Sequence, residues 1–490
     1  MDFASAIKNE QKWTRTENGA VALNTTGDAV LNLFSTIGSL RQTDNNRIET
    51  LVSEAFAEDP LLTMKCLFYC RDIREGLGER NTFKVAIKYL ANKHPEAVEK
   101  NINLFGEYGR YDDLYCLVGT PVEDKMWEVV SEQLKADMAA YSENKPVSLL
   151  AKWLKTADAS SSKTRKMGIY TAQKLGLSVY IYKRLVRKLR KYINITESQM
   201  CAQEWDKIDY AAVPSRASML YRNAFKKHDA MRYNEFINKV NCGEAKINAA
   251  TLYPYDLIEK YRGGYWSSYW RTNEDAAIEA LWKNLPNYVQ PGTNAVVIAD
   301  TSGSMLGRPM NSAVGLAVYF AEHNTGAYHN LWMTFSSCPT WQRLQGQTLC
   351  QKLNSMNMHG WDNNTNLRAA FELVLNTAIN NRVSPDEMPK SIIVISDMEI
   401  DYCGDREWTF YDKMKARFAQ FGYEIPQIIF WNVNSRHDVF HADSKRKGVI
   451  LCSGQSTTTF KNLINSVGMT PVEYMKNVLN SERYEAVKIV

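Results

Sequence analysis

The chain has 490 residues, of which 45% are hydrophobic and 23% are charged, a composition that excludes wholesale disorder and is typical of a globular protein. The net charge of +5 is mild for this length and by itself selects neither nucleic acid nor an acidic partner. No apolar run approaches the roughly 20 residues of a membrane helix, and the N-terminus lacks the apolar core of a signal peptide. We therefore expect a cytoplasmic protein without a membrane partner.

The first half of the sequence has the pattern of helices joined by short loops. From about Leu51 to Trp282, apolar residues recur at spacings of three and four. Successive helix pairs predict an α-helical repeat domain of the HEAT-like type over residues 1–288, and whether it closes into a ring stays open. Cys66 and Cys70 stand one turn apart in an apolar stretch, and none of the nine cysteines forms a Cys-x-x-Cys pair. These cysteines are expected to be buried thiols rather than a disulfide framework or a zinc site.

Positive charge is concentrated in one part of this helical half. Between Lys152 and Tyr192 there are twelve Lys or Arg residues and one acid, which gives the segment a charge of +11 and leaves −6 for the rest of the chain. Residues 182–192 fit an amphipathic helix whose cations face solvent, and residues 160–165 are expected to form a loop. Such a surface can neutralise several phosphates of RNA, although a solvated face or a membrane-surface helix has the same pattern. The candidate RNA-binding residues are Lys163, Arg165, Lys166, Lys183, Arg184, Arg187, Lys188, Arg190 and Lys191.

The pattern changes near Pro291. Short β-rich apolar runs alternate with helical stretches from here on, which predicts a mostly parallel, doubly wound α/β domain over residues 289–490. The expected strands lie at residues 295–299, 331–335, 391–395, 427–431 and 449–452.

A short polar motif follows the first of these strands. Asp300, Ser302 and Ser304 form Asp-x-Ser-x-Ser at the edge of the sheet where α/β proteins bind ligands. A carboxylate and two hydroxyls are hard oxygen ligands that suit Mg²⁺ or another divalent cation. Asp397 follows a second strand, and Thr365 precedes an expected helix as either a ligand or an N-cap. The alternative for the motif is an ordinary capped strand-to-helix turn.

Other polar residues near this edge are expected to have no chemical role. Glu399 and Asp401 follow Asp397 and could add negative charge near the site, but they are interpreted as solvated acids. His437 and His441 are four residues apart in a loop-like segment, but no Glu stands between them as in a metalloprotease. Because no base stands beside the motif and no phosphate-binding loop is present in the sequence, we do not expect an enzyme.

The second half resembles the von Willebrand factor A domain with its metal-ion-dependent adhesion site. The resemblance implies that Asp300, Ser302, Ser304, Thr365 and Asp397 hold one divalent cation, with an open position for an acidic group of a partner. The sequence departs from that family in one respect, because Asn363 and Asn364 stand where glycine usually precedes the threonine.

Nearly the whole chain resembles, more loosely in its helical half, the Ro autoantigen family, in which a TROVE-type helical module precedes a von Willebrand factor A domain. The match is closer to uncharacterised Ro-like proteins that share the strings at residues 71–80, 107–114, 213–217 and 224–229. The resemblance implies a non-enzymatic, monomeric ribonucleoprotein scaffold that binds small structured or single-stranded RNA. The alternative is a metal-dependent protein–protein adaptor that recognises an acidic residue of its partner. The charged residues of the shared strings are interpreted as caps and loop-bracing pairs.

Overall fold

The chain forms two compact units. A computed structural model describes residues 12–263, 270–356, 365–402, 407–463 and 466–489. One unit, here called the sheet unit, comprises Met1–Cys66 and Ala249–Ser481, and the other, the helical unit, comprises Leu67–Asn248 and Glu482–Val490. The first 66 residues thus group with the second half of the chain, and the last nine residues group with the helical unit. Among the described helices, none is long and apolar enough to cross a membrane.

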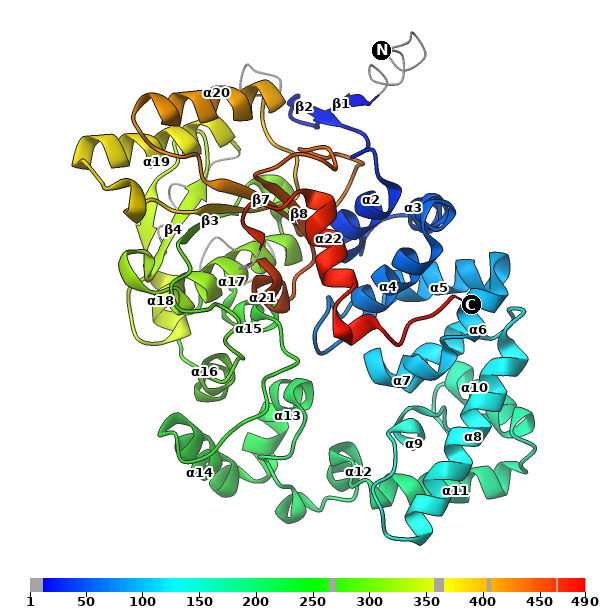
Figure 1. Cartoon of the computed structure of the whole chain (residues 1–490). Coiled ribbons are helices and arrows are strands. Elements are labelled where there is room, and N and C mark those ends of the chain that lie inside the picture. The colour runs from blue at the N-terminus through cyan, green and yellow to red at the C-terminus, as the bar shows by residue number, and fades with distance from the viewer. Residues whose placement is uncertain (1–11, 264–269, 357–364, 403–406, 464–465, 490) are drawn as a thin grey trace. The chain divides into compact units, whose positions relative to one another are not determined.

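The sheet unit is built on a six-stranded sheet of order β5-β4-β3-β6-β7-β8 (Figure 1). All neighbouring strands are parallel except β5, which pairs antiparallel with β4. This order is that of a doubly wound α/β sheet, whose direction of winding reverses between β3 and β6. The expected α/β fold is confirmed. The strands are β3 (Ala295–Asp300), β4 (Leu331–Phe335), β5 (Trp341–Arg343), β6 (Ser391–Ser396), β7 (Gln427–Asn432) and β8 (Val449–Ser453).

Helices cover both faces of this sheet. α17 (Arg308–His323) packs against β3, β4 and β6, and 13 of its residues are buried. α19 (Leu367–Asn381) packs against β4 and against α20 (Glu407–Gln420). Figure 1 shows α19 and α20 on one side of the sheet and α17 with α21 (Thr458–Leu463) on the other. The parallel strands β3, β6, β7 and β8 are buried along their whole length, as is typical of parallel strands covered by helices.

The N-terminal segment belongs to the sheet unit. α2 (Ala29–Thr36) is buried at every position from Val30 to Thr36 and packs against β8, as does α22 (Pro471–Leu479). Just after α2 and β8, the backbones of Gly38 and Gly454 approach each other closely. A Cβ on Gly38 would lie 2.6 Å from the Cα of Gly454. A helix buried on all sides cannot serve as the outer helix of a repeat. The remaining elements of this unit are the hairpin of β1 (Trp13–Arg15) and β2 (Val21–Leu23), and helices α3 (Asn45–Glu58), α15 (Pro254–Tyr261), α16 (Ala276–Lys283) and α18 (Leu349–Ser355).

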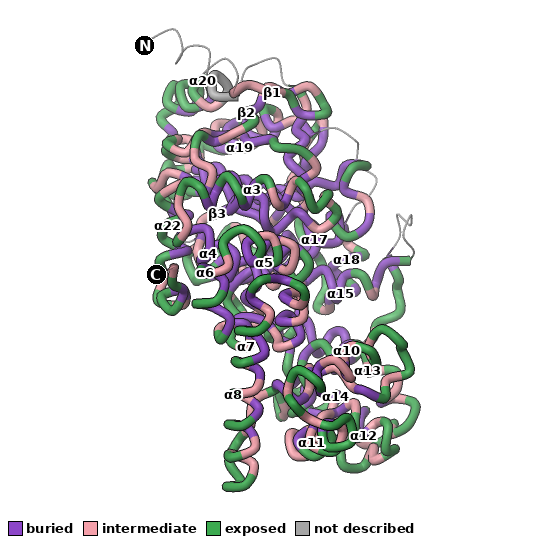
Figure 2. Tube along the Cα trace, turned by 90° about the vertical axis from the view of Figure 1, so that its right-hand side faces the viewer, coloured by how far each residue is buried: buried purple, intermediate pink, exposed green. Residues whose placement is uncertain are grey.

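The helical unit confirms the expected helical half. Buried residues recur along its longest helix, α8 (Glu123–Ser142), at Met126, Trp127, Val130 and Leu134, which is the spacing of one helix face (Figure 2). The other helices are α5 (Asn81–Lys93), α6 (Pro95–Glu99), α7 (Phe105–Tyr108), α9 (Leu150–Trp153), α10 (Ser162–Lys174), α11 (Val179–Tyr192), α12 (Thr196–Cys201), α13 (Ser215–His228) and α14 (Ala230–Asn241). α4 (Pro60–Arg71) connects the two units along the chain.

The charged strings of the helical unit pair with one another. The guanidinium of Arg71 lies 2.6 Å from Asp113 Oδ2, and both side chains are at most 3% exposed. Arg80 and Lys84 approach the other oxygen, Asp113 Oδ1, at 3.1 and 3.3 Å. Burial works to raise the pKa of Asp113, but these cations outweigh it and hold the pKa below its usual value. The interpretation of these residues as bracing pairs is confirmed.

The cysteines are free thiols wherever they are described. Cys66, Cys70, Cys350 and Cys452 are buried, as expected for the first two, and burial raises the pKa of the Cys66 thiol. The remaining described cysteines are Cys116, Cys201, Cys242 and Cys338, of which the last three are exposed. Cys403 lies outside the described residues.

Candidate functional site

Two aspartates meet at the point where the winding of the sheet reverses. β3 ends at Asp300, and Asp397 follows the last residue of β6. The strands are parallel neighbours in the register Ala299 to Ile395, so their carboxyl ends lie side by side. Asp300 is 0% and Asp397 2% exposed. The sequence prediction that these two carboxylates share one edge of the sheet is met.

Hydrogen bonds link the motif after β3 to the end of β6. Asp300 Oδ1 accepts from the backbone N–H of Ser302 at 2.9 Å, and Asp300 Oδ2 accepts from the hydroxyl of Ser396 at 2.6 Å. The hydroxyls of Ser302 and Ser304 lie 3.1 Å apart, and Ser304 hydrogen-bonds to Asp397. Four of the five expected metal ligands therefore belong to one connected group.

The surroundings make ionisation of both carboxyls unfavourable. Burial and, second, the charge of Asp397 raise the pKa of Asp300 to about 6, although hydrogen bonds from Ser396 and Ser302 act in the opposite direction. Burial also raises the pKa of Asp397, against the hydrogen bond from Ser304 and the charge of Arg436. A cation at this position would relieve the repulsion and the cost of burial together.

Thr365 lies in a different set of contacts. Its backbone N–H donates to Asp401 Oδ2 at 2.5 Å, and its hydroxyl accepts from the backbone N–H of Asp401 at 3.0 Å. The N-cap of α19 is Asn366, whose side chain accepts from Ala369, so the N-cap alternative for Thr365 is wrong. Its role as a metal ligand stays a prediction. Asn363 and Asn364, where the sequence departs from the resembled family, lie outside the described residues.

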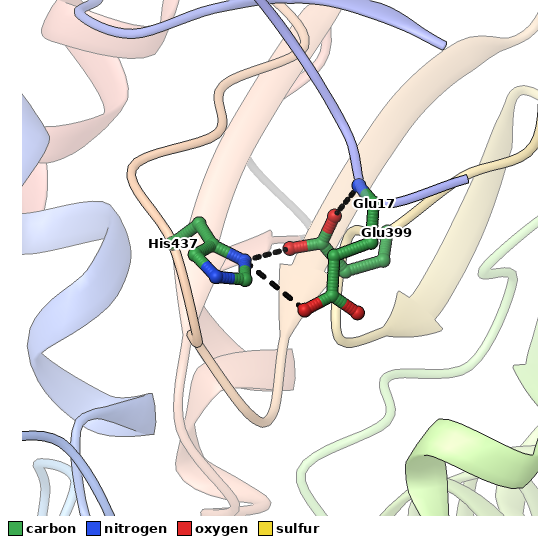
Figure 3. A group of neighbouring side chains, drawn as sticks. All are labelled: Glu17, Glu399 and His437. Carbon is green, nitrogen blue, oxygen red and sulfur yellow. Dashed lines mark hydrogen bonds and ion pairs between the residues drawn. The ribbon is translucent and has the colours of Figure 1, made fainter. Parts of the chain in front are cut away.

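Glu399 is a buried residue, which corrects the expectation of a solvated acid. Its side chain is 2% exposed, and Oε2 accepts from the backbone N–H of Glu17 at 2.6 Å. Its other oxygen lies 3.0 Å from Nδ1 of His437, a histidine for which no role was expected (Figure 3). Asp401 is half-buried. Sequence reasoning missed this group because nothing local shows that residue 17 folds onto residue 399.

Arg436 connects this group to the aspartates. Its Nη2 lies 3.0 Å from Asp397 Oδ2, and its Nη1 lies 2.6 Å from Glu17 Oε2. One guanidinium thus pairs with the buried carboxylate of Asp397 and the exposed carboxylate of Glu17. Arg436 stands next to His437 in a loop after β7, a position that no sequence motif distinguishes.

The residues present fit a divalent cation of the hard, oxygen-seeking type. The carboxylate and hydroxyl oxygens of Asp300, Ser302, Ser304 and Asp397 form a donor set suited to Mg²⁺. The hydroxyl of the intervening Thr301 is buried and has no hydrogen-bond partner among the described residues, and a bound water or ion commonly satisfies such a group.

A separate candidate surface lies on α10 and α11 of the helical unit. Ser178 caps α11 by accepting from Ile181 N–H, and Tyr182, Val186 and Leu189 are its buried face. The exposed residues of the opposite face follow one another at intervals of four, three, one and three positions, so they form one stripe along the helix. This α11 stripe consists of Tyr180, Arg184, Arg187, Lys188 and Lys191. Tyr180 is 73% exposed, and the Arg187 side chain is 77% exposed.

Arg190 is a structural residue rather than part of this surface. Its guanidinium donates to the backbone carbonyls of Ala151, Lys152 and Leu154 at 2.8, 3.3 and 2.7 Å. Five of the six cations of α11 thus remain on the solvent side. The expected loop at residues 160–165 is also corrected, because α10 begins at Ser162 with Ser161 as its cap. Lys163, Arg165 and Lys166 are exposed on the first turns of that helix.

A groove of about 870 Å³ follows the side of α11. Its lining includes the cations Lys183, Arg187, Lys191 and Lys207 beside the apolar Val186. Two acids also line the groove, Asp158 at 3.0 Å from Lys183 Nζ and Glu204 at 2.8 Å from Lys207 Nζ. The volume is within the range of ligand-binding clefts. A groove whose cations outnumber its acids and that has an apolar side can accept an extended polyanion.

Two family models, each described as a domain of unknown function, together match nearly the whole chain. A model described as a domain of unknown function (DUF2828) matches residues 16–127 and 124–290. A second domain of unknown function (DUF7788) matches residues 294–488.

Two individual proteins align with a similar length of the chain. An uncharacterized protein, L728, of Acanthamoeba polyphaga mimivirus is 28% identical over 514 residues, which cover 95% of this chain and 86% of that protein. The crystal structure of the Deinococcus radiodurans RO (RSR) protein aligns with 94% of this chain and 100% of that chain, at 14% identity and a TM-score of 0.47.

Proposed function

The chain belongs to the DUF2828 family, and we propose that it is a non-enzymatic RNA-binding scaffold that also holds a divalent cation. RNA binding is assigned to the α11 stripe and the groove beside it. The cation is assigned to Asp300, Ser302, Ser304 and Asp397, with Thr365 as a further candidate ligand.

The observation that carries the RNA proposal is the composition of the α11 stripe. Four cations and one tyrosine cover one exposed face of a helix, over a length of about 16 Å. Phosphate groups attract such a row regardless of sequence, and an exposed aromatic ring gives unpaired bases a surface on which to stack. The exposed cations of α10 widen the same positive region, because α10 and α11 pack against each other.

Few acids neutralise this surface. Among the described residues, Asp158 is the only carboxylate that lies within 4 Å of a cation of the stripe, at 3.7 Å from Arg187. Arg184, Lys188 and Lys191 have no ion pair with a described carboxylate, although Lys188 lies over the ring of Tyr141. A solvated face balanced by acids, the alternative expected from sequence, would show such pairs along its length.

The cation proposal is supported by two carboxylates buried against each other beside two hydroxyls. A Mg²⁺ ion held by these oxygens would keep some of its waters, one of which an acidic group could replace. An adaptor that recognises an acidic residue of a protein partner is therefore the second candidate function, and it uses this site instead of the α11 stripe. The two functions are separable because their residues lie in different units.

Charge reversal on α11 tests the proposal. Filter binding with a uridine-rich single-stranded RNA and with a small hairpin RNA compares the full chain with the triple variant Arg184→Glu, Arg187→Glu, Lys191→Glu. We expect affinity for at least one RNA to fall by a factor of about 100 or more. The matched control reverses three exposed cations of α20, Lys413, Lys415 and Arg417, and is expected to bind as the parent does.

The same experiment separates the two candidate functions. Equal RNA binding by the α11 variant and the α20 control would overturn the RNA proposal. Purification with and without nuclease adds a second readout, since an RNA binder carries material that absorbs as nucleic acid. A protein that carries none, but retains an acidic partner protein only when Mg²⁺ is present, would favour the adaptor.

A further inference from the structure

Three ligand atoms converge in the sheet unit outside the proposed Mg²⁺ site. They come from Glu17, Glu399 and His437, one from each side chain, and all three atoms lie within 4.8 Å of one another. His437 Nδ1 is 3.0 Å from Glu399 Oε1 and 3.5 Å from Glu17 Oε1 (Figure 3). No residue of this group belongs to the Asp-x-Ser-x-Ser motif.

From this convergence we propose a second metal site, of the zinc type, at Glu17, Glu399 and His437. Zinc binds histidine nitrogen and carboxylate oxygen at about 2.0 to 2.2 Å, which sets tetrahedral ligand atoms about 3.4 Å apart. The two distances from His437 Nδ1 lie on either side of this spacing. Magnesium and calcium prefer ligand sets of oxygen alone, so the nitrogen selects for zinc or a similar transition metal.

Each carboxylate is oriented by a partner on its other oxygen. Glu399 Oε2 accepts from the backbone N–H of Glu17 at 2.6 Å, and Glu17 Oε2 lies 2.6 Å from Arg436 Nη1. One oxygen of each acid is therefore held by the protein, while the other faces His437. Outer contacts of this kind fix the direction of metal-binding groups.

One ligand of the group is buried and the other two are exposed to solvent, so the site is accessible. The Glu399 side chain is 2% exposed, whereas those of Glu17 and His437 are 41% and 54% exposed. The ion can thus enter from solvent, and water can fill the fourth position. Because Glu17 and Glu399 are 382 residues apart in sequence, a metal between them fastens the N-terminal segment to the loop after β6.

Isothermal titration of the chelator-treated full chain with ZnCl₂ tests this site. His437→Ala and Glu17→Gln are each expected to lower zinc affinity by about tenfold or more at one site. The matched control is His329→Ala, which removes an exposed histidine elsewhere in the same unit and should bind as the parent does. The exposed thiols of Cys201, Cys242 and Cys338 can also bind zinc, but they are present in the parent and in every variant. Their contribution is therefore the same in each titration.

Two further measurements show whether a loss of zinc binding comes from unfolding or from the Mg²⁺ site. Co²⁺ in place of zinc gives visible absorption bands of a four-coordinate ion, which should disappear in His437→Ala and persist in Asp300→Asn. Glu17→Gln should melt as the parent does in chelator, since its side chain is partly exposed. Equal zinc affinity and equal Co²⁺ spectra in the parent, His437→Ala and Glu17→Gln would overturn the proposal.

Discussion

The guanidinium of Arg436 lies 3.0 Å from Oδ2 of Asp397, so that a positive side chain offsets the charge of the aspartate that directly follows β6. The Asp397 side chain is 1% exposed and the Arg436 side chain 32% exposed. Removing the partner of a buried charge leaves that charge uncompensated, and this costs far more than the loss of a surface ion pair.

Arg436→Met is therefore expected to lower the free energy of unfolding by about 2 kcal/mol in chelator. Mg²⁺ should recover part of the loss, because a bound cation supplies charge to the same carboxylate. Urea denaturation with and without Mg²⁺ measures both quantities. A variant as stable as the parent in chelator would show that the pair does not compensate Asp397.

Asp300→Asn should stabilise the metal-free protein and at the same time remove its response to Mg²⁺. At pH 7.5 in chelator it is expected to raise the free energy of unfolding by about 2 kcal/mol, because it removes a buried carboxylate that is costly to ionise. The stabilisation that Mg²⁺ gives the parent should be lost at the same time. Asp386→Asn, at an exposed acid of the same unit, is the control. Equal Mg²⁺ stabilisation of Asp300→Asn and the parent would contradict the site.

The pKa of Asp300 also predicts a dependence on pH. Between its usual value of 3.8 and about 6, the folded protein holds a proton on this carboxyl that the unfolded chain does not. The free energy of unfolding in chelator should thus rise as the pH falls from 7 through 6 and level off near 4. The comparison with Asp300→Asn isolates this contribution, and a parent-minus-variant difference that stays constant over this range would contradict the assignment.

The five parallel strands of the large sheet could be predicted to within one residue, whereas the site around Glu399 could not. Buried parallel strands such as β6 and β7 are continuous apolar runs that sequence displays directly. The three-residue strands β1, β2 and β5 carry no such run. The contact between Glu17 and Glu399 depends on the return of the N-terminal segment to the sheet, and no local pattern encodes it. Arg190 was misassigned because its spacing cannot distinguish solvent from the carbonyl groups at the end of α9.

Arg190 and Arg184 should therefore respond differently to substitution. Arg190→Ala is expected to lower the free energy of unfolding by about 2 kcal/mol, since three carbonyl groups lose a charged donor. Arg184→Ala, on the exposed face, should change stability by less than about 0.5 kcal/mol and weaken RNA binding. Chemical denaturation and filter binding of both variants test whether Arg190 has the structural role and Arg184 the RNA-binding role. The assignment fails if Arg190→Ala is as stable as the parent.

Tyr180 is expected to contribute by stacking instead of by charge. Tyr180→Ala should weaken binding of single-stranded RNA by about tenfold, while Tyr180→Phe should bind as the parent does, because the ring is what stacks. Neither variant should change the dependence of affinity on salt. Unchanged affinity in Tyr180→Ala would remove this residue from the α11 stripe as a functional group.

The dependence of RNA affinity on salt tests the central claim most directly. For single-stranded RNA, each phosphate contact contributes about −0.7 to the slope of log affinity against log salt concentration. The triple variant Arg184→Glu, Arg187→Glu, Lys191→Glu is predicted to bind with a slope shallower by about 2 or more, whereas the α20 control keeps the slope of the parent. Identical slopes for the parent and the α11 variant would contradict RNA binding by this helix.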